Sequence, residues 1–456
     1  MNELNHLDED QLKAVKYLDN ALVIAGAGSG KTTTIIAKIN YLLKNNYYKK
    51  EEILVISFTN ESVKSIKERL EEEIAVKTFH KLAVDLIENK NLTICKEDYL
   101  DYIINEFFCS YALSDKKTKE RMKRLLKETT LGNIKILVKT FINLYKSNYQ
   151  TNDFLFYLYK HNHFKNKDYL TIILIVYQLY LRELEASGML DFNDLIIYAT
   201  NLIKNNTIST NYKLVIIDEF QDTSAIRFEL IQSILKANNG KLFAVGDDYQ
   251  SIYRFSGCDL GIFLNINKYL PNIQMLFLNH NYRNPLNLVE VANEFILRNK
   301  RQIKKNTICH KNVDKPLVFH FYREVTQVFR TIQKLDGKIL VLGRNNRDRE
   351  RFGIVEDERI RFLTIHRAKG LEEENVVLIN LDNHLLGFPS QIKNEVLITK
   401  VLKQDYVMHE EERRLMYVAL TRTKNKVYLF VPKDNYSIFI KELISNYKKL
   451  IEIKFL

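Results

Sequence analysis

The segment that most constrains the fold of this chain is residues 25–32, which read Ala-Gly-Ala-Gly-Ser-Gly-Lys-Thr. The apolar run Ala21–Ile24 precedes it, and residues 33–43, which have helical spacing, follow it. A strand, a glycine-rich loop and a helix in this order form a phosphate-binding loop, because the glycines let backbone N–H groups point at an anion. The segment predicts a nucleoside triphosphate site in an α/β fold. The alternative is a glycine-rich surface turn, because Ala25 stands where the strict pattern has glycine.

Two side chains of this loop have distinct expected roles. Lys31 would neutralise the outer phosphates, and the Thr32 hydroxyl would ligate Mg²⁺ at the helix N-terminus. The candidate nucleotide-binding residues of the loop are Ala25, Gly26, Ala27, Gly28, Ser29, Gly30, Lys31, Thr32 and Thr33.

An acidic pair after another apolar run supplies the second half of such a site. Asp218 and Glu219 directly follow Leu214–Ile217, a run typical of a buried strand. Asp218 would hold Mg²⁺, and Glu219 would orient and deprotonate the water that attacks the γ-phosphate. Binding alone would not need Glu219, so the pair predicts hydrolysis. The alternative is a solvated acidic turn.

Composition limits the class of protein and its partners. A length of 456 residues is enough for two or three domains, and the net charge of +12 favours a polyanionic partner. The four cysteines have no metal-ligand spacing, so neither a zinc site nor a disulfide framework is indicated. The polar first ten residues do not resemble a secretion signal, and no apolar run is long enough to span a membrane. We therefore expect a cytoplasmic protein.

The order of apolar runs predicts two α/β lobes with parallel sheets and a helical insertion in the first. The first set of strands is expected at residues 21–24, 53–57, 214–217 and 242–245, and a second set at residues 275–278, 317–321, 339–342, 360–363, 376–379 and 426–430. Residues 90–188 are rich in Lys, Tyr and Leu, lack such runs and show helical spacing. The tail, residues 431–456, is interpreted as a short amphipathic helix. The predicted domains are 1–89 with 189–278, the insertion 90–188, and 279–456.

Five further segments narrow the class of ATPase. They are residues 218–223 (DEFQDT), 246–257 (GDDYQSIYRFSG), 281–283 (NYR), 364–372 (TIHRAKGLE) and 411–422 (EERRLMYVALTR). This ordered series resembles the UvrD/Rep family of superfamily-one DNA helicases, and the resemblance runs from Gln11 to Phe430. It implies that ATP and Mg²⁺ bind between two RecA-like lobes and that single-stranded DNA crosses both. It also implies movement in the 3′ to 5′ direction.

The resemblance assigns roles around the nucleotide. Gln11 matches the glutamine that reads adenine, Tyr282 would stack on that base, and Glu372 resembles the residue that contacts the ribose. The expected catalytic residues are Lys31, Asp218, Glu219, Gln250, Arg283 and Arg422. Among them, Gln250 matches a γ-phosphate sensor, and the two arginines match residues that reach the γ-phosphate from the second lobe.

The resemblance also assigns DNA contacts to both lobes. The candidates are Phe58, Thr59, Asn60, Thr78, Phe79, His80, Tyr253, Phe255, His366 and Arg367. Hydroxyl, amide and imidazole groups would contact phosphates, and the rings of Phe79, Tyr253 and Phe255 could stack on bases. The alternative for Phe79 and Phe255 is a place in the core. Phe255 stands where many relatives carry Trp.

One departure from the large relatives concerns strand separation. They carry a large accessory domain in the second lobe, whereas here a short charged segment, residues 348–359, precedes the strand expected at 360–363. The resemblance extends further to the core of helicase IV, for example in Gly387-Phe388-Pro389. We expect that the accessory domain is absent. The sequence therefore supports ATP hydrolysis more strongly than it supports strand separation, for which a core of this kind can need a partner.

Three functions remain open from the sequence. The first is a 3′ to 5′ DNA helicase in repair or recombination that acts on single strands and on junctions with duplex. The second is the motor subunit of a larger assembly, for instance with a separately encoded nuclease in an antiphage system of the Gabija type. The third is a nucleotide-gated DNA-binding protein with weak unwinding. Purification with a partner would favour the second function. If the Glu219→Gln substitution left the behaviour of the protein unaltered, the third function would be favoured.

Overall fold

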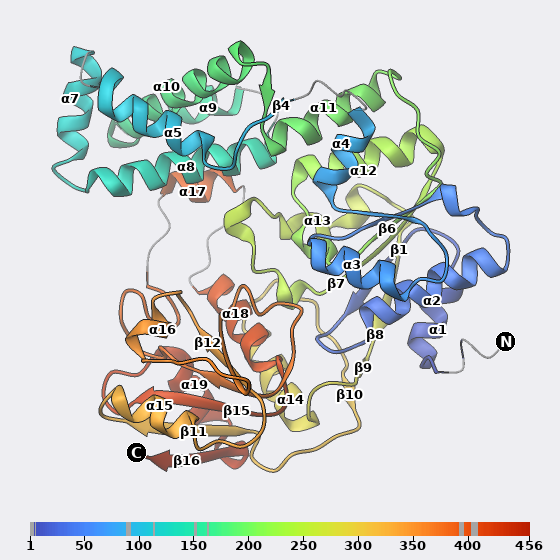
Figure 1. Ribbon diagram of the computed structural model, residues 1–456, viewed down its shortest axis with the longest axis vertical. Coiled ribbons are helices and arrows are strands. Elements are labelled where there is room, and N and C mark those ends of the chain that lie inside the picture. The colour runs from blue at the N-terminus through green and yellow to red at the C-terminus, as the bar shows by residue number, and fades with distance from the viewer. Residues whose placement is uncertain are drawn as a thin grey trace.

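The computed structural model shows two α/β lobes and a separate group of helices (Figure 1). The structure describes residues 4, 6–87, 93–112, 115–149, 153–161, 164–391, 396–402 and 409–456. The predicted boundary between residues 89 and 90 lies outside these ranges. In the described residues, no helix is both long and apolar enough to cross a membrane.

The sheet of the first lobe is parallel throughout. Its strands, in spatial order, are β3 (Ala75–Lys77), β2 (Ile53–Ile56), β6 (Leu214–Ile217), β7 (Lys241–Gly246), β1 (Ala21–Ala25) and β8 (Gln274–Leu278). Parallel strands place all their carboxyl ends at one edge, so the loops that follow β1, β6 and β7 meet there. These loops carry the phosphate-binding segment, the acidic pair and Gln250.

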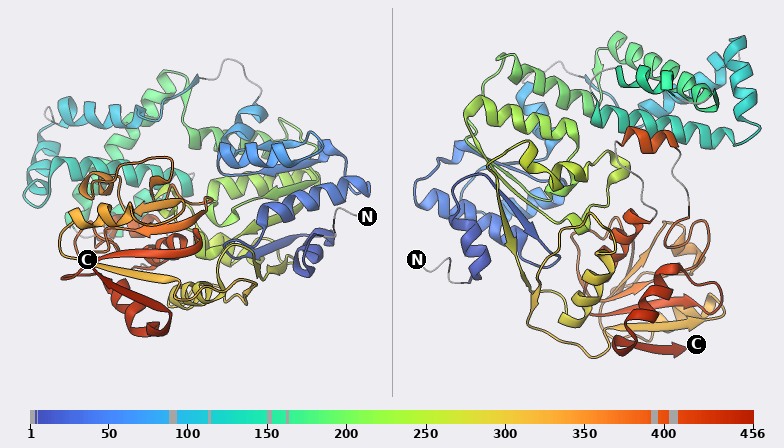
Figure 2. Two further views of the ribbon diagram at one scale, coloured as in Figure 1. Left: turned by 60° about the horizontal axis from the view of Figure 1, so that its bottom comes forward. Right: turned by 180° about the vertical axis from the view of Figure 1, so that it is seen from behind.

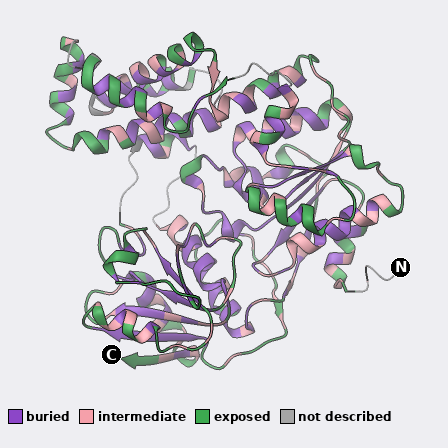
Figure 3. Ribbon diagram, viewed as in Figure 1, coloured by how far each residue is buried: buried purple, intermediate pink, exposed green. Residues whose placement is uncertain are grey.

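Alternating side chains of these strands pack under helices on both faces. One face packs with α1 (Glu9–Lys16), α2 (Lys31–Lys44) and α3 (Asn60–Arg69), and the other with α4 (Phe79–Ile87), α11 (Phe192–Lys204) and α12 (Ala225–Asn238). Figure 3 shows the strands as the buried centre of the lobe. Because both faces are covered, the strands read as continuous apolar runs rather than alternating ones.

The second lobe repeats this plan. Its parallel strands, in spatial order, are β13 (Ile360–Thr364), β12 (Ile339–Gly343), β14 (Glu373–Leu378), β15 (Thr423–Pro432), β11 (Leu317–Tyr322) and β16 (Ile451–Phe455). Its helices are α14 (Leu286–Ile296), α15 (Thr326–Ile332), α16 (Asp348–Arg351), α18 (Glu410–Leu420) and α19 (Ile438–Asn446). Helix α17 (Val396–Val401), from the same stretch of the sequence, packs instead with the helices of residues 93–186. Two RecA-like lobes are therefore present, as the sequence predicts.

The helices that follow the first part of lobe one in the sequence form their own apolar core. Figure 2 shows these helices from two further sides. We call residues 93–186 the helical insertion. It contains α5 (Tyr99–Glu106), a π-helical turn (Phe107–Tyr111), α7 (Lys116–Leu125), α8 (Leu131–Asn148), α9 (Asp153–His161) and α10 (Phe164–Ala186). A pair of two-residue strands at its base, β4 (Thr93–Ile94) and β5 (Met189–Leu190), did not stand out in the sequence.

Two sequence interpretations are wrong in detail. The run at 275–278 was grouped with the second set of strands, although the predicted domain bounds put it in the first lobe; it belongs to β8 of the first sheet, where it pairs with β1. The tail is not one helix, because α19 is followed by β16, which pairs with β11. In β16, Ile451, Ile453 and Phe455 alternate with polar residues, and this period of two fits an edge strand rather than a helix.

His320 generates a stability prediction for the second lobe. It lies in β11, it is 3% exposed, and its ring stacks on Phe430. Neither ring nitrogen has a hydrogen-bond partner among the described residues. Burial lowers the pKa of this imidazole to about 4. The unfolded chain therefore takes up the proton first, and stability falls as the pH drops from about 6.5 to about 4, by up to about 3 kcal/mol.

Replacement with a ring that cannot titrate should remove this acid sensitivity. We expect His320→Phe to flatten the pH dependence of second-lobe stability in this window, measured by hydrogen exchange of β11 and β15 amides. The same substitution at the exposed His384 should leave the dependence unchanged. An equally steep loss of protection in His320→Phe would contradict the prediction.

Candidate nucleotide and DNA site between the lobes

The loop after β1 is shaped for an anion. Gly30 is the N-cap of α2 with φ 79°, and Gly28 has φ 70°, conformations that favour glycine. A Cβ on Gly30 would lie 2.5 Å from Gln11 Nε2, and one on Gly28 would lie 2.6 Å from Arg283 Cβ. The Ser29 hydroxyl donates to Gly26 O at 3.0 Å. The loop thus leaves the N–H groups at the start of α2 directed at a phosphate site, which fits a nucleotide.

The acidic pair lies beside this loop, at the end of β6. Glu219 Oε1 is 3.6 Å from Lys31 Nζ, and Glu219 Oε2 accepts a hydrogen bond from Gln221 Nε2 at 2.5 Å. Burial and then the charge of Glu219 raise the pKa of Asp218. Burial acts against the charged form of Glu219 as well, but the ammonium groups of Lys31 and Lys369 outweigh it and lower the pKa of Glu219. Glu219 is therefore the ionised member of the pair.

Lys369 is a member of this site that the sequence analysis did not single out. Its ammonium forms an ion pair with Asp222, donates to Gln250 O at 2.8 Å and lies 3.4 Å from Glu219 Oε2. It comes from the second lobe, whereas its three partners belong to the first. The signal was its place in the same motif as His366 and Arg367. Lys369 links the lobes directly at the acidic pair.

The two arginines expected at the γ-phosphate lie on the second-lobe side of the same site. Arg422 is 1% exposed and its Nη2 donates to Gln250 Oε1 at 2.9 Å. Arg283 Nε donates to Glu372 Oε2 at 2.6 Å. Glu372 also pairs with Lys424 at 2.9 Å, so here its carboxylate is engaged by two cations. The structure brings together the expected catalytic side chains from both lobes.

The residues expected to hold the base lie together at the other end of the loop. Gln11 is 3% exposed and its Nε2 donates to Ser29 O at 3.2 Å. Asp8 accepts from the Gln11 backbone N–H at 2.8 Å and from the Tyr282 hydroxyl at 2.5 Å. The ring of Tyr282 is 55% exposed. One polar side chain and one open aromatic face therefore lie beside the phosphate loop, a combination suited to a purine.

A second buried cation, Lys305, holds the loop that contains Gln250. Its ammonium pairs with Asp247 and with Asp248 at 2.7 Å and lies 3.6 Å from the centre of the Tyr249 ring. Asp247 in turn accepts from Gln250 Nε2 at 2.6 Å. Lys305 lies outside every motif used in the sequence analysis, so only its spatial position shows its role. It fixes the carboxylate that orients Gln250.

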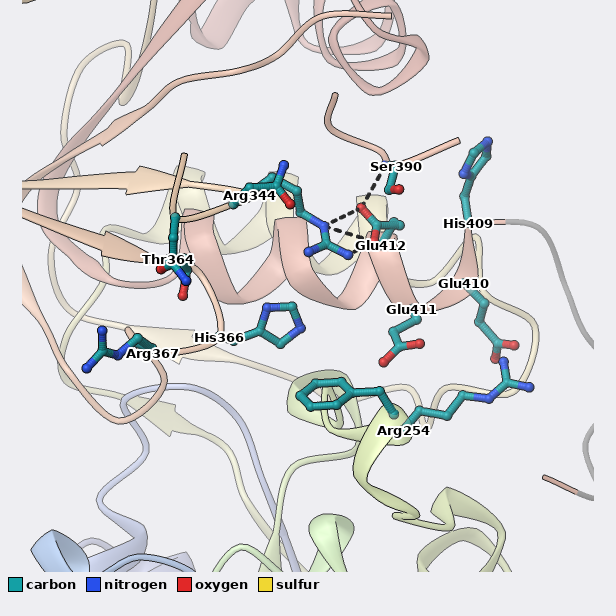
Figure 4. A pocket seen from close by; sticks show the side chains of 13 residues that line it. Arg254, Arg344, Thr364, His366, Arg367, Ser390, His409, Glu410, Glu411 and Glu412 are labelled. Carbon is teal, nitrogen blue, oxygen red and sulfur yellow. Dashed lines mark hydrogen bonds and ion pairs between the residues drawn. The ribbon is translucent and has the colours of Figure 1, made fainter. Parts of the chain in front are cut away.

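The DNA candidates of the second lobe border a pocket of ≈ 610 Å³ (Figure 4). It is lined by Arg254, Phe255, Arg344, Asn345, Asn346, Thr364, His366, Arg367, Ser390, His409, Glu410, Glu411 and Glu412. Phe255 is 57% exposed, and its ring centre is 5.4 Å from that of His366. The Tyr253 hydroxyl donates to His366 O at 3.0 Å. The structure thus brings together Tyr253, Phe255, His366 and Arg367.

Charges in this pocket are mixed but mostly balanced. Arg344 forms a bidentate pair with Glu412, with a shortest distance of 2.7 Å, and Glu410 pairs with Arg301 at 2.7 Å. Burial and then the charge of Arg344 lower the pKa of His366 to about 4. His366 is therefore neutral near pH 7 and offers hydrogen bonds rather than charge.

The DNA candidates of the first lobe differ in exposure: some lie at the surface and others lie in the core. Thr59 and Asn60 are exposed at the start of α3, and Thr78 caps the first turn of α4 through Lys81 N at 3.3 Å. Phe79 is 3% exposed and packs edge-on against Phe58 in the core. The core alternative thus holds for Phe79, and its ring has no open face for a base.

Arg227 lies beside the rings of Phe58 and Phe79, and His80 follows Phe79 in the chain. The Arg227 guanidinium lies 5.4 Å from the Phe58 ring centre and 5.8 Å from that of Phe79. His80 packs on Phe192, and burial followed by Arg227 lowers the pKa of His80 to about 4. Arg227 was absent from the sequence predictions, because it stands on α12 outside the quoted motifs.

The fold and the site together define a two-lobed P-loop protein whose nucleotide site is completed by side chains of both lobes. Residues 7–271, more than half of the chain, match the UvrD/REP helicase N-terminal domain, and residues 348–434 match the UvrD-like helicase C-terminal domain. The chain belongs to the UvrD/REP helicase family.

Several curated proteins are similar over long stretches. DNA helicase IV of Escherichia coli is 28% identical over 97% of this chain and 71% of its own length. A probable DNA helicase II homologue of Mycoplasma capricolum is 32% identical over 70% of this chain and 44% of its own length. The ATP-dependent DNA helicase Rep of Buchnera aphidicola (subspecies Schizaphis graminum) is 31% identical over 66% and 45%, respectively. The chain therefore spans less than half of the latter two relatives.

The ion pairs of Lys305 with Asp247 and Asp248 generate a prediction about stability. Lys305→Met leaves Asp247 and Asp248 buried without their cation, so we expect a loss of about 3–5 kcal/mol in unfolding free energy, measured by denaturant titration. Adding Asp248→Asn should recover part of this loss, because one uncompensated charge is removed. Lys304→Met, at the neighbouring position, is the matched control and should stay near wild type. Equal stability of Lys305→Met and wild type would contradict the assignment.

Proposed function

We propose that this chain is a DNA-dependent ATPase that moves along single-stranded DNA in the 3′ to 5′ direction and separates strands. The observation that carries the proposal is the loop of residues 247–255. At one end Gln250 contacts Arg422, and at the other Phe255 lines the pocket beside His366. A change at the nucleotide can therefore move the surface offered to DNA. The direction of movement is proposed from the resemblance to the UvrD/Rep family.

The nucleotide half of the mechanism uses residues of the first lobe. Thr32 and Asp218 would hold Mg²⁺, which supplies positive charge to the phosphates when bound. The buried carboxyl of Asp218, with its raised pKa, is a group that a divalent cation stabilises in its charged form. Glu219 is ionised and oriented by Gln221, so it can accept the proton of the attacking water. Lys31 would neutralise the outer phosphates.

The second lobe supplies the cations that tie hydrolysis to movement. Arg283 lies against the phosphate loop at Gly28, and Arg422 reaches Gln250 from across the lobe boundary. Both would stabilise charge that develops on the transferred phosphoryl group. Because these groups stand on the other lobe, full stabilisation needs the lobes to close. Closure and release would then shift the two DNA-contacting surfaces relative to each other.

The DNA half of the mechanism uses the pocket. Phe255 offers an exposed ring for stacking, and the neutral His366 can donate to a phosphate oxygen. Neither group reads base identity, so we propose binding without sequence preference. The names of the relatives, which describe DNA helicases, support a DNA substrate.

A second candidate is a motor subunit that separates strands only with a partner, such as a nuclease. Between β12 and β13 the chain has only α16 and short connections, at the place where larger relatives carry an accessory domain. A core of this size can translocate while another protein opens the duplex.

The first test is ATP hydrolysis with and without a single-stranded oligonucleotide. We expect strong stimulation by DNA, and we expect Lys31→Ala and Arg422→Ala to lower kcat by at least about 10³-fold because each removes charge stabilisation at the transferred phosphoryl group. Binding of ATP to Arg422→Ala should stay within a few-fold of wild type. The Glu219→Gln variant gives the background rate of ATP hydrolysis in this assay.

The outcomes of this test separate the candidates. Arg361→Ala, at an exposed position of β13, is the matched arginine control and should hydrolyse ATP normally. Normal turnover in Lys31→Ala or Arg422→Ala would remove the catalytic assignment. Normal hydrolysis without stimulation by DNA would favour a subunit that awaits its partner. Wild-type turnover no higher than that of Glu219→Gln would favour a nucleotide-gated binding protein.

The pocket generates a prediction for DNA binding. Phe255→Ala should weaken binding of a single-stranded oligonucleotide by about 1–3 kcal/mol, the size of one stacking contact, and should leave the salt dependence unchanged because phosphate contacts remain. Phe156→Ala, on the exposed face of α9, is the aromatic control. Fluorescence anisotropy at several salt concentrations measures both quantities. A changed salt slope with unchanged affinity would contradict the stacking role.

A further inference from the structure

Lys38 is a buried lysine of α2, the helix that begins at the phosphate loop. It is 2% exposed, and its ammonium lies 5.0 Å from the centre of the Phe243 ring. In the part of the chain that the structure describes, no ion pair joins this ammonium to a carboxylate, and burial lowers the pKa of Lys38 to about 8. A buried charge is costly unless hydrogen bonds compensate it, so the acceptors of Lys38 indicate its role.

The acceptors of this ammonium are backbone carbonyls at the C-terminal end of α1. Lys38 Nζ donates to Val15 O at 3.0 Å, to Ala14 O at 3.5 Å and to Tyr17 O. Carbonyls in the last turn of a helix have no N–H partner within the helix, and they form the negative end of its dipole. Lys38 therefore caps α1 and ties it to α2, which lies beside α1 in Figure 1.

The first turn of α1, at its opposite end, carries the side chains expected at the base. Gln11 Nε2 donates to Ser29 O in the phosphate loop, and Gln11 Oε1 accepts from the Asp8 N–H at 3.2 Å. Asp8 in turn accepts from the Tyr282 hydroxyl. The N-terminal cap of α1 and the candidate base site thus share the same side chains, so a shift of α1 moves the base site.

The position of α1 depends on its contacts with the rest of the lobe. The helix has eight residues, and a helix of that length is not stable alone in water. Its partner α2 starts at Lys31, the residue expected at the outer phosphates, and Lys38 lies two turns further along the same helix. The spacing between base site and phosphate site is therefore set by how α1 lies against α2.

We propose that Lys38 is a positioning residue for recognition of the nucleotide base. By capping α1 it holds Gln11 at the distance from the phosphate loop at which the amide can pair with the edge of adenine. The inference rests on the proposed function, because the nucleotide must be hydrolysed at this site. Lys38 acts through Gln11, so its loss affects the choice of base rather than the transfer of the phosphoryl group.

The test compares steady-state hydrolysis of ATP and UTP in the presence of a single-stranded oligonucleotide. The smaller base of UTP lacks the amino group of adenine, and the wild type should prefer ATP. Lys38→Met should lower kcat/KM for ATP about ten-fold, the size of a hydrogen bond to the base, mainly through KM. It should leave kcat/KM for UTP unchanged. Lys16→Met, at an exposed position in the last turn of α1, is the matched control and should behave as wild type with both nucleotides.

A Gln11→Ala background shows whether Lys38 acts through Gln11. In that background Lys38→Met should cause no further loss with ATP, because the two substitutions remove the same contact. A full additional loss there would overturn the positioning role. Unchanged ATP kinetics in Lys38→Met, or an equal fall with ATP and UTP, would overturn it as well, since an equal fall marks a general loss of structure.

The wild type separates this inference from the proposed function. Equal kcat/KM for ATP and UTP would overturn base recognition at Gln11, and with it the role of Lys38, while the ATPase assignment stands. Wild-type turnover of both nucleotides no higher than that of Glu219→Gln would overturn the proposed function itself and, with it, the inference.

Discussion

At the functional centre of this molecule, buried cations of the second lobe reach across the lobe boundary to acceptors of the first. Arg422 reaches Gln250, Arg414 reaches the Ser251 carbonyl, and Lys369 reaches Asp222. A buried charge without a partner costs several kcal/mol, so the lobes can meet in only a few arrangements. Any phosphate charge added at this boundary changes the balance of these pairs. We therefore expect the arrangement of the two lobes to respond to a bound nucleotide.

The same boundary joins the candidate nucleotide site and the candidate DNA pocket. The carboxyl ends of β1, β6 and β7 place the phosphate loop, the acidic pair and Gln250 side by side. Five residues after Gln250, Phe255 lines the candidate DNA pocket and packs near α8. One short loop therefore contacts the nucleotide side, the second lobe and the helical insertion.

The sequence predicted the phosphate loop and the acidic pair correctly, because the geometry of each depends on residues that are neighbours in the chain. Glycines 28 and 30 sit at positive φ where the phosphate loop requires it, and Asp218 follows a buried strand, because both features depend on neighbouring residues. Phe79 was ambiguous, since an aromatic residue in a helix serves a core or a stacking surface equally well, and Phe58 and Arg227 decide for the core. Lys305 and Arg227 were missed because their partners are distant in the chain. The tail was misread because its alternation was too short to separate from a helix.

The sequence by itself determined the two-lobed α/β class, the nucleotide loop and the family, because strand, loop and helix signals act over a few residues and occur here in a specific order. Only the tertiary structure decided that β8 pairs with β1 at the edge of the first sheet, which cations satisfy the acidic residues at the lobe boundary, and where α17 docks. These depend on burial and pairing between segments far apart in the chain. Apolar spacing predicts that a helix has a buried face, but only the packed molecule shows what covers that face.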